Sequence, residues 1–319
     1  MKVVVATHGH CFDGLASAVM FTRLRQVAGG DAPTFEYRSC GYGAGQQKPD
    51  DRLLAGDENA ILDFRFSTSP KLTWYFDHHR TAFSTDAERR LFEERAGSGR
   101  FFYDAECSSC TRLLERIGRE RFDFSDPHLD ALVRWADVVD TASFESAEQA
   151  IDRTDPVMRL VSVVEHYGDD RFLTRLVPKL LEKPLAEVAV LKEIEDRYHS
   201  IGKRHARFIE RVKKHAQKIG RVVFVDLTDE VQDTIGKFVT YALYPECMYS
   251  VVVGLMKNGA KISVGYNPWS GHELDADISE ICARHGGGGH PVVGGISFKK
   301  DELDRAREVA REIVDELSG

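Results

Sequence analysis

The sequence predicts an α/β protein with an N-terminal parallel-sheet domain, a helical connector and a smaller C-terminal α/β domain. Up to residue 140, short apolar runs with strand character alternate with helical patterns, which is typical of parallel sheets. Residues 155–218 have a helical pattern, and strand character resumes at 221–226. The chain has 319 residues, enough for two domains of ordinary size. We therefore place a domain boundary near residues 218–220.

Composition narrows the class of protein. The chain is 42% hydrophobic and 29% charged, and it contains no apolar run of about 18 residues, so we expect no membrane span. Residues 1–6 lead directly into polar residues, unlike a signal peptide, and we expect a cytoplasmic protein. The net charge of −8 argues against a general nucleic-acid coat. It still allows a local basic groove, or metals that supply positive charge.

The first strand and helix enclose a polar loop. Residues 2–7 predict a buried strand, 8–14 a loop and 15–27 a helix. This order is common at phosphate and metal sites, because helix N-termini favour anions and the loop projects ligands. His8 and Asp13 could reach one centre from opposite ends of the loop. The alternative is a simple turn built on Asp13 and Gly14.

Two later strands end in acids. Residues 35–39, 59–63, 72–76 and 101–104 predict strands, and Asp63 and Asp77 stand at the ends of the second and third of these. Ligands of open α/β sheets gather at the carboxyl ends of the strands. His78 and His79 follow Asp77, and neutral histidine is a common ligand of Mn²⁺, Fe²⁺ and Zn²⁺. The alternative is a polar junction with a hydrogen-bonded histidine pair.

Helices follow as far as residue 218. One starts near Ser108, and another starts at Pro127 and ends near Asp137 or Asp140. On local sequence alone, both of these acids would be solvent-exposed. The highly charged residues 188–216 predict a solvated helix between domains.

The last hundred residues predict a second α/β domain. We expect a strand at 221–226, a helix at 229–242 and a hairpin of 249–256 with 261–266, turned by Asn258 and Gly259. A helix at 276–284, a strand ending at residue 298 and a helix at 302–317 complete it. Four consecutive glycines precede the strand that ends at residue 298. Their backbone N–H groups could wrap a phosphate, with His290 as a further donor. The alternative is a flexible loop. The glycines are Gly286, Gly287, Gly288 and Gly289.

The six cysteines predict reduced thiols. Cys107 and Cys110 alone have C-x-x-C spacing, and no second pair follows at zinc-ribbon distance. We place this pair near a helix start and favour no redox or metal role for it.

Three features together resemble the DHH phosphoesterase superfamily, specifically members with a C-terminal DHH-associated domain. They are His8 with Asp13-Gly14-Leu15-Ala16, then Asp77-His78-His79, and then the glycine run with His290. The resemblance spans nearly the whole chain. It implies a DHH metal-binding catalytic domain at 1–150, a helical connector at 151–220 and a substrate-binding domain at 221–319, with the active cleft between the domains.

The resemblance also implies two divalent ions, most often Mn²⁺, with Mg²⁺, Fe²⁺ or Zn²⁺ as alternatives. His8 and Asp63 would hold the first ion, and Asp77 would bridge both. The second would be held by Asp13, His78 and an acid of the helix begun at Pro127, for which we choose Asp137 over its rival Asp140. His79 would contact the scissile phosphate, Arg80 would add a phosphate contact or remain a surface cation, and the glycine run with His290 would bind the rest of the nucleotide.

Cys11 departs from the superfamily pattern. The first motif usually has two acids alternating before the glycine, and here Cys11 takes the place of the first acid. Thiolate is a softer ligand than carboxylate and would favour Zn²⁺ or Fe²⁺ over Mn²⁺. Alternatively, Cys11 is no ligand, and the first ion is weakly held, or His10 fills the gap.

The leading functional hypothesis is a hydrolase that releases nucleoside monophosphates from short oligonucleotides. Length and acidic charge resemble the small bacterial oligoribonucleases of the superfamily more than the larger RecJ-like exonucleases. A cyclic dinucleotide, 3′-phosphoadenosine 5′-phosphate or polyphosphate are alternative substrates. A different class is a nucleotide-binding sensor or interaction protein whose turnover is weakened by Cys11. The resemblance also allows a homodimer.

Overall fold

The computed structural model describes residues 1–27, 32–42, 47–232 and 236–319. The chain folds into two compact units. The first comprises residues 1–143 and 153–201, and the second comprises 144–152 and 202–319. The division at 150 and 220 and the cleft between the domains stay predictions.

The first unit is built on a five-stranded parallel sheet with strand order β2-β1-β3-β4-β5. This confirms the predicted parallel sheet. Strand β1, which has a neighbour on each side, is almost continuously buried, as expected for a parallel strand covered on both faces. The strands are β1 (Lys2–His8), β2 (Thr34–Cys40), β3 (Glu58–Leu62), β4 (Trp74–Asp77) and β5 (Phe101–Tyr103).

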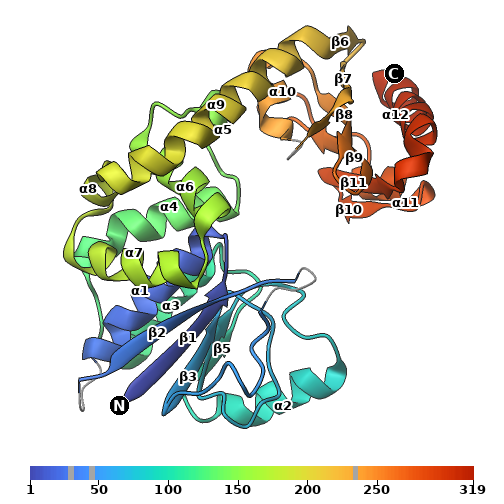
Figure 1. The fold of residues 1–319 in the computed structure, drawn as a ribbon. Helices are drawn as coiled ribbons and strands as arrows, with labels where there is room; N and C mark the ends of the chain where they lie inside the picture. Colours follow the sequence, from blue (N-terminus) through green and yellow to red (C-terminus); the bar gives the residue numbers. More distant parts are fainter. Residues whose placement is uncertain (28–31, 43–46, 233–235) are drawn as a thin grey trace. The chain divides into compact units, whose positions relative to one another are not determined.

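Helices cover this sheet, and α1 is central among them (Figure 1). It packs on β1 and β3 and against the helices α3, α4, α6 and α7, so its residues are buried on nearly every side. The helices of this unit are α1 (Phe12–Val27), α2 (Asp86–Ala96), α3 (Cys110–Phe122), η1 (Pro127–Leu129), α4 (Asp130–Asp140), α6 (Pro156–Tyr167), α7 (Asp170–Glu182) and α8 (Leu185–Ala189). Helix α9 (Lys192–His215) begins in the first unit and continues into the second.

Helix α1 begins three residues earlier than predicted. Its first turn contains Asp13 and Gly14, for which the sequence pattern predicts a loop. The early start is possible because residue 14 lacks a side chain: a Cβ there would lie 2.1 Å from the His8 carbonyl oxygen. The consequence is that Asp13 projects from the first turn of a buried helix, directly beside the end of β1.

The second unit contains a six-stranded mixed sheet with strand order β10-β11-β9-β8-β7-β6. Only β7 and β8 run parallel among its described strands, and the other neighbours are antiparallel. The strands are β6 (Ala216–Ile219), β7 (Val222–Gln232), β8 (Tyr249–Met256), β9 (Gly259–Tyr266), β10 (Gly288–His290) and β11 (Val293–Phe298). The helices are α5 (Ala147–Ile151), α10 (Lys237–Leu243), α11 (Ile278–Arg284), η2 (Lys300–Glu302) and α12 (Leu303–Ser318).

Successive side chains of β7 point to opposite faces of this second sheet and join a different hydrophobic core on each face. Val222 and Phe224 join the core formed with α11 and α12, while Val223 and Val225 join a second core with α9 and α10. The predicted hairpin of β8 and β9 is confirmed. The predicted helix at 229–242 is wrong in its first part, because β7 continues to Gln232 by pairing with β8 past a register shift. Residues 233–235 of that prediction lie outside the described residues.

None of the helices in the described ranges combines the length and apolar character needed to cross a membrane.

Candidate metal centre

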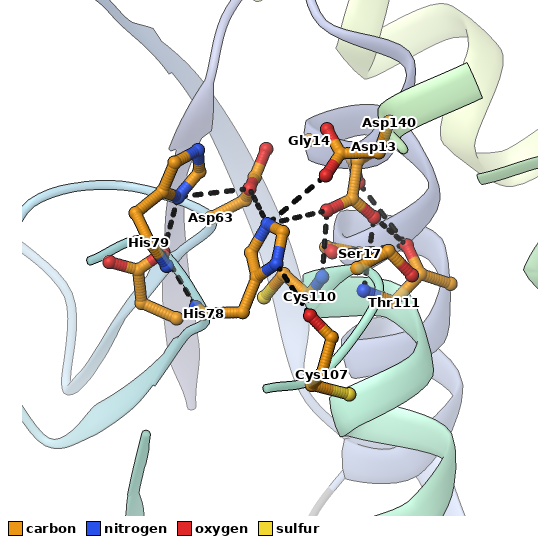
Figure 2. Close-up of polar contacts among 12 residues, drawn as sticks. Asp13, Gly14, Ser17, Asp63, His78, His79, Cys107, Cys110, Thr111 and Asp140 are labelled. Atoms are coloured by element: carbon orange, nitrogen blue, oxygen red, sulfur yellow. Dashed lines mark hydrogen bonds and ion pairs between the residues drawn. The ribbon is translucent and has the colours of Figure 1, made fainter. Parts of the chain in front are cut away.

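Acidic and imidazole side chains meet where β1, β3 and β4 end. His8 is the last residue of β1, Asp63 follows β3, and His78 follows β4. Asp13 comes from the first turn of α1 and Asp140 from the last residue of α4. Figure 2 shows Asp13, Asp63 and Asp140 directed towards the ring of His78. The cluster thus lies at the carboxyl ends of the parallel strands, where open α/β proteins place their ligands.

His78 lies at the centre of this cluster. Its Nδ1 is 3.0 Å from the backbone carbonyl oxygen of Cys107, which only accepts, so Nδ1 carries the proton and donates. The other nitrogen, Nε2, then presents a lone pair. It is buried without a hydrogen-bond partner and lies 3.4 to 3.7 Å from carboxylate oxygens of Asp140, Asp63 and Asp13. A cation between this lone pair and the carboxylates would satisfy both, and a metal-binding histidine commonly donates its other N–H to a carbonyl.

Asp63 is the most isolated acid of the cluster. It is fully buried, and neither of its carboxylate oxygens has a hydrogen-bond partner among the described residues. Its backbone has a φ of +53°, a left-handed conformation that is strained for a side-chain-bearing residue. Burial, and then repulsion from Asp13, raise the pKa of Asp63 well above its ordinary value. An ionised carboxylate here needs a positive partner.

Asp13 is held by the N-terminus of α3. Its carboxylate accepts from the backbone N–H groups of Cys110 (2.7 Å) and Thr111 (3.0 Å) and from the Thr111 hydroxyl (2.6 Å). These donors fix the carboxylate of Asp13 beside His78. No sequence pattern links Asp13 to residues almost a hundred positions later.

The described residues contain three groups of potential metal ligands, and within each group the ligand atoms lie within 4.8 Å of one another. They are His8 with Cys11 and Asp63, Asp63 with His78 and His79, and Asp13 with His78 and Asp140. Imidazole nitrogen, carboxylate oxygen and thiol sulfur are ligands of divalent transition metals. The donor types and the unpartnered buried atoms therefore fit metal ions, with Asp63 shared between neighbouring groups.

Cys11 lies within this cluster. Burial, and then the carboxylates of Asp63 and Asp13, raise the pKa of the Cys11 thiol well above its ordinary value. The thiol is thus neutral beside these acids unless a cation offsets their charge.

Asp77 has a different environment from the one expected for a bridging ligand. Its Oδ2 accepts from the Tyr75 hydroxyl at 3.0 Å. Its Oδ1 accepts from the His78 backbone N–H (2.9 Å) and from Nδ1–H of His79 (2.7 Å). Asp77 is absent from all three groups of ligand atoms among the described residues. The hydrogen bond from His79 to Asp77 raises the pKa of the His79 imidazole.

The structure brings Asp140, and not Asp137, to the cluster. Asp137 accepts from the hydroxyls of Ser108 (2.6 Å) and Ser109 (2.7 Å) and forms an ion pair with Arg112, with Nη2 at 2.5 Å. Asp140 lies one turn later on α4, 3.4 Å from Nε2 of His78. Burial, followed by repulsion from Asp13, raises the pKa of Asp140 to about 6. Asp137 already has a cationic partner in Arg112, whereas among the described residues Asp140 faces only the imidazole of His78.

The sequence matches no family model and no curated protein, but solved structures share its fold. A pGpG-specific phosphodiesterase, PggH from Vibrio cholerae, is 18% identical with a TM-score of 0.67, and 99% of each chain is covered. A DHH domain described as belonging to a family of ribosomal proteins is 14% identical with a TM-score of 0.56, over 98% of this chain and 86% of that one. RecJ from Thermus thermophilus in complex with Mn²⁺ is 12% identical with a TM-score of 0.56, over 99% of this chain and 52% of that one. The chain has the fold of these DHH-domain structures.

The structure also describes the surroundings of two predicted substrate contacts. Arg80 is largely exposed and pairs with the equally exposed Glu106 at 3.2 Å. In the second unit, Gly288, Gly289 and His290 form the exposed strand β10, which pairs with β11 at the edge of the sheet. At Gly287 a Cβ would lie 2.3 Å from the Gly295 carbonyl oxygen, so close packing by itself explains why residue 287 is a glycine. Phosphate binding by the glycine run stays a prediction.

Proposed function

We propose that this protein is a divalent-metal-dependent phosphodiesterase that hydrolyses short oligonucleotides, dinucleotides above all, to nucleoside monophosphates. The observation that carries the proposal is the set of ligand atoms on Asp63 and His78 that are buried without a hydrogen-bond partner among the described residues. These atoms lie at the carboxyl ends of the parallel strands. Its support comes from the pGpG-specific phosphodiesterase, which matches this chain over 99% of both lengths. RecJ, of which this chain spans 52%, is a less complete match.

In this proposal two ions share the cluster, with ligands revised from those the sequence predicted. His8, Cys11 and Asp63 would hold one ion, and Asp13, His78 and Asp140 the other. Asp63 lies beside both groups, because its Oδ1 is 3.6 Å from Nε2 of His78, whereas Asp77 belongs to neither among the described residues. Asp140 replaces Asp137 because Arg112 already neutralises Asp137. When bound, a pair of divalent ions lowers the pKa of water and offsets negative charge on a phosphoryl group.

The chain's own side chains would orient the reaction. Asp77 accepts a hydrogen bond from Nδ1–H of His79, so the other ring nitrogen of His79, Nε2, points away from Asp77. Because this hydrogen bond raises the pKa of His79, the imidazole keeps a proton that it can donate to a phosphoryl or leaving-group oxygen. In the balanced reaction, water forms the new bond to phosphorus, the bond to the leaving nucleoside oxygen breaks, and that oxygen takes up a proton.

Cys11 favours a second candidate function, a nucleotide-binding sensor with weakened turnover. The raised pKa of its thiol means that metal binding at the first group must displace a proton. A protein that holds one ion instead of two would retain phosphate affinity while losing much of its rate. Counting the bound ions therefore separates the two candidates.

The test is hydrolysis of a 5′-labelled RNA dinucleotide by the purified protein, with and without Mn²⁺, alongside metal analysis of the same sample. Asp63→Asn is the test variant. Asp104→Asn is its control, because Asp104 also follows a strand end but pairs with Arg116 outside the cluster. We expect Mn²⁺-dependent release of mononucleotide, lost in Asp63→Asn and kept in Asp104→Asn. No turnover with two bound ions would refute dinucleotide hydrolysis, and no turnover with one ion or none would favour the sensor.

A further inference from the structure

An aromatic and cationic stack adjoins the metal cluster in the first unit. The rings of Tyr42 and Phe64 are stacked, with centroids 4.4 Å apart and planes 24° from parallel. The guanidinium carbon of Arg65 lies 5.3 Å from the centroid of the Tyr42 ring. Phe64 is buried, whereas Tyr42 is 48% exposed and Arg65 is exposed. The stack thus has a buried base and an exposed end.

This stack is coupled in space to a proposed metal ligand. The His8 ring lies 5.7 Å from the Tyr42 ring and 5.8 Å from the Phe64 ring. Phe64 also follows Asp63 directly in the chain. A phosphodiester bound at the cluster would therefore place one of its attached nucleosides near the stack.

A cavity of about 730 Å³ opens beside the stack and is lined by Tyr42, Phe64 and Arg65. This volume lies in the range of small-molecule sites, roughly 300–1,000 Å³, and suits a nucleotide. Elsewhere its lining includes Lys48 and the hydroxyl-bearing Ser67 and Thr68. The combination of aromatic surface with a few polar groups suits a polar heterocycle.

The lining of the cavity carries charges of both signs, Lys48, Arg52 and Arg65 against Asp50 and Asp51, so its net charge is small and suits a neutral base better than a multiply charged phosphate group. Arg52 is already paired with Asp50 at 2.8 Å, and Asp51 adds a further negative charge to the lining. Arg65 has no ion-pair partner in the part of the chain that the structure describes, and its planar guanidinium lies over the aromatic ring. Guanidinium planes and aromatic rings are both platforms on which unpaired bases stack.

We infer that this cavity is a nucleobase subsite, in which Arg65, supported by Tyr42 and Phe64, stacks on the base of one terminal nucleoside of the substrate. The inference rests on the proposed function for the placement of that substrate. It assigns Arg65 a role in affinity and base selection, distinct from phosphate recognition and from metal binding.

The experiment measures binding, so that it does not depend on turnover. Adenosine 5′-monophosphate and ribose 5-phosphate are titrated calorimetrically into the whole chain in Mn²⁺. The two probes share the sugar phosphate, and the second has a hydroxyl in place of the base. The variants are Arg65→Ala, Arg65→Lys, which keeps the charge but loses the plane, and the control Arg89→Ala. Arg89 also lies over aromatic rings, 5.0 Å from Phe83 and 5.1 Å from Tyr103, but outside the cavity.

We expect wild type to bind the mononucleotide at least tenfold more tightly than ribose 5-phosphate, as a stacking contact would give. Both Arg65 variants should lose about tenfold in affinity for the mononucleotide and keep their affinity for ribose 5-phosphate, and Arg89→Ala should match wild type. Equal losses for both probes in Arg65→Ala, restored in Arg65→Lys, would identify a phosphate contact and overturn the inference. Unchanged binding in both Arg65 variants, or no preference for the base in wild type, would also overturn it. Failure of wild type to cleave a dinucleotide would refute the proposed function alone.

Discussion

Asp137 and Asp140 lie one turn apart on α4, and substituting each in turn by alanine should have opposite consequences. Asp137 stabilises the fold through the hydroxyls of Ser108 and Ser109 and the guanidinium of Arg112. Asp140 faces Nε2 of His78 and has a pKa raised by burial and by Asp13. Asp137→Ala should therefore destabilise the protein and keep its metal, and Asp140→Ala should do the reverse.

The magnitude for Asp137→Ala follows from its contacts. Two hydroxyl hydrogen bonds contribute about 1 kcal/mol each. The ion pair is partly solvent-screened, since the side chains of Asp137 and Arg112 are 18% and 35% exposed, and we assign it about 1 kcal/mol. The sum is a loss of about 2–3 kcal/mol in the free energy of unfolding. Asp140→Ala removes a carboxylate that repels Asp13, so the metal-free variant should be at least as stable as wild type.

The assay has two readouts on the same preparations. Urea unfolding of chelator-treated protein gives the free energy of unfolding, and elemental analysis of Mn²⁺-loaded, dialysed protein gives ions per chain. We expect Asp140→Ala to hold about one ion fewer than wild type and to lose turnover. If Asp137→Ala lost an ion while Asp140→Ala retained two ions and full turnover, the ligand assignment would be refuted.

Three further substitutions test other parts of the site. Asp77→Asn removes the cause of the raised pKa of His79. In wild type the protonated imidazole persists below that raised pKa and is lost as pH rises through it, so the alkaline limb of kcat/KM against pH should move to lower pH in the variant; an unmoved limb would contradict the role of His79 as proton donor. Cys11→Asp supplies a hard carboxylate ligand and should tighten Mn²⁺ binding at least tenfold in a metal titration, whereas unchanged affinity would mean that residue 11 is no ligand. His290→Ala should raise KM for the dinucleotide about tenfold with little change in kcat, the pattern for a lost ground-state contact, and a pure kcat defect would argue against substrate binding by the glycine run.

The sequence predicted the sheet and the location of the cluster because both depend on local patterns. The apolar run of β1 and the acids that follow β3 and end β4 are visible without any long-range information. The choice between Asp137 and Asp140 was not visible, because Arg112 on α3 decides it across 25 positions of sequence. Likewise, the donors that hold Asp13 come from Cys110 and Thr111.

The environment of Asp77 could have been foreseen from the geometry of a strand. Alternate residues of a strand share a face, so Asp77 lies on the same side of β4 as Tyr75. Tyr75 is fully buried, and its hydroxyl donates to Asp77. The resemblance implies a bridging Asp77, and this alternation explains why one oxygen of its carboxylate instead meets the Tyr75 hydroxyl.

Asp63 shows how the fold prepares the cluster for a cation. Residue 63 is an aspartate and not a glycine, yet its backbone has a left-handed φ of +53°. Its N–H donates to the Phe76 carbonyl oxygen at 2.9 Å. This bond to the neighbouring strand β4 helps to hold a conformation that costs on the order of 1–3 kcal/mol. The strained backbone places an unpartnered carboxylate among His8, Cys11 and His78. Among the described residues this buried acid has a raised pKa and no hydrogen-bond donor, which disfavours the ion-free fold. A cation bound at Asp63 would offset this cost, so metal affinity and fold stability would be coupled through this residue.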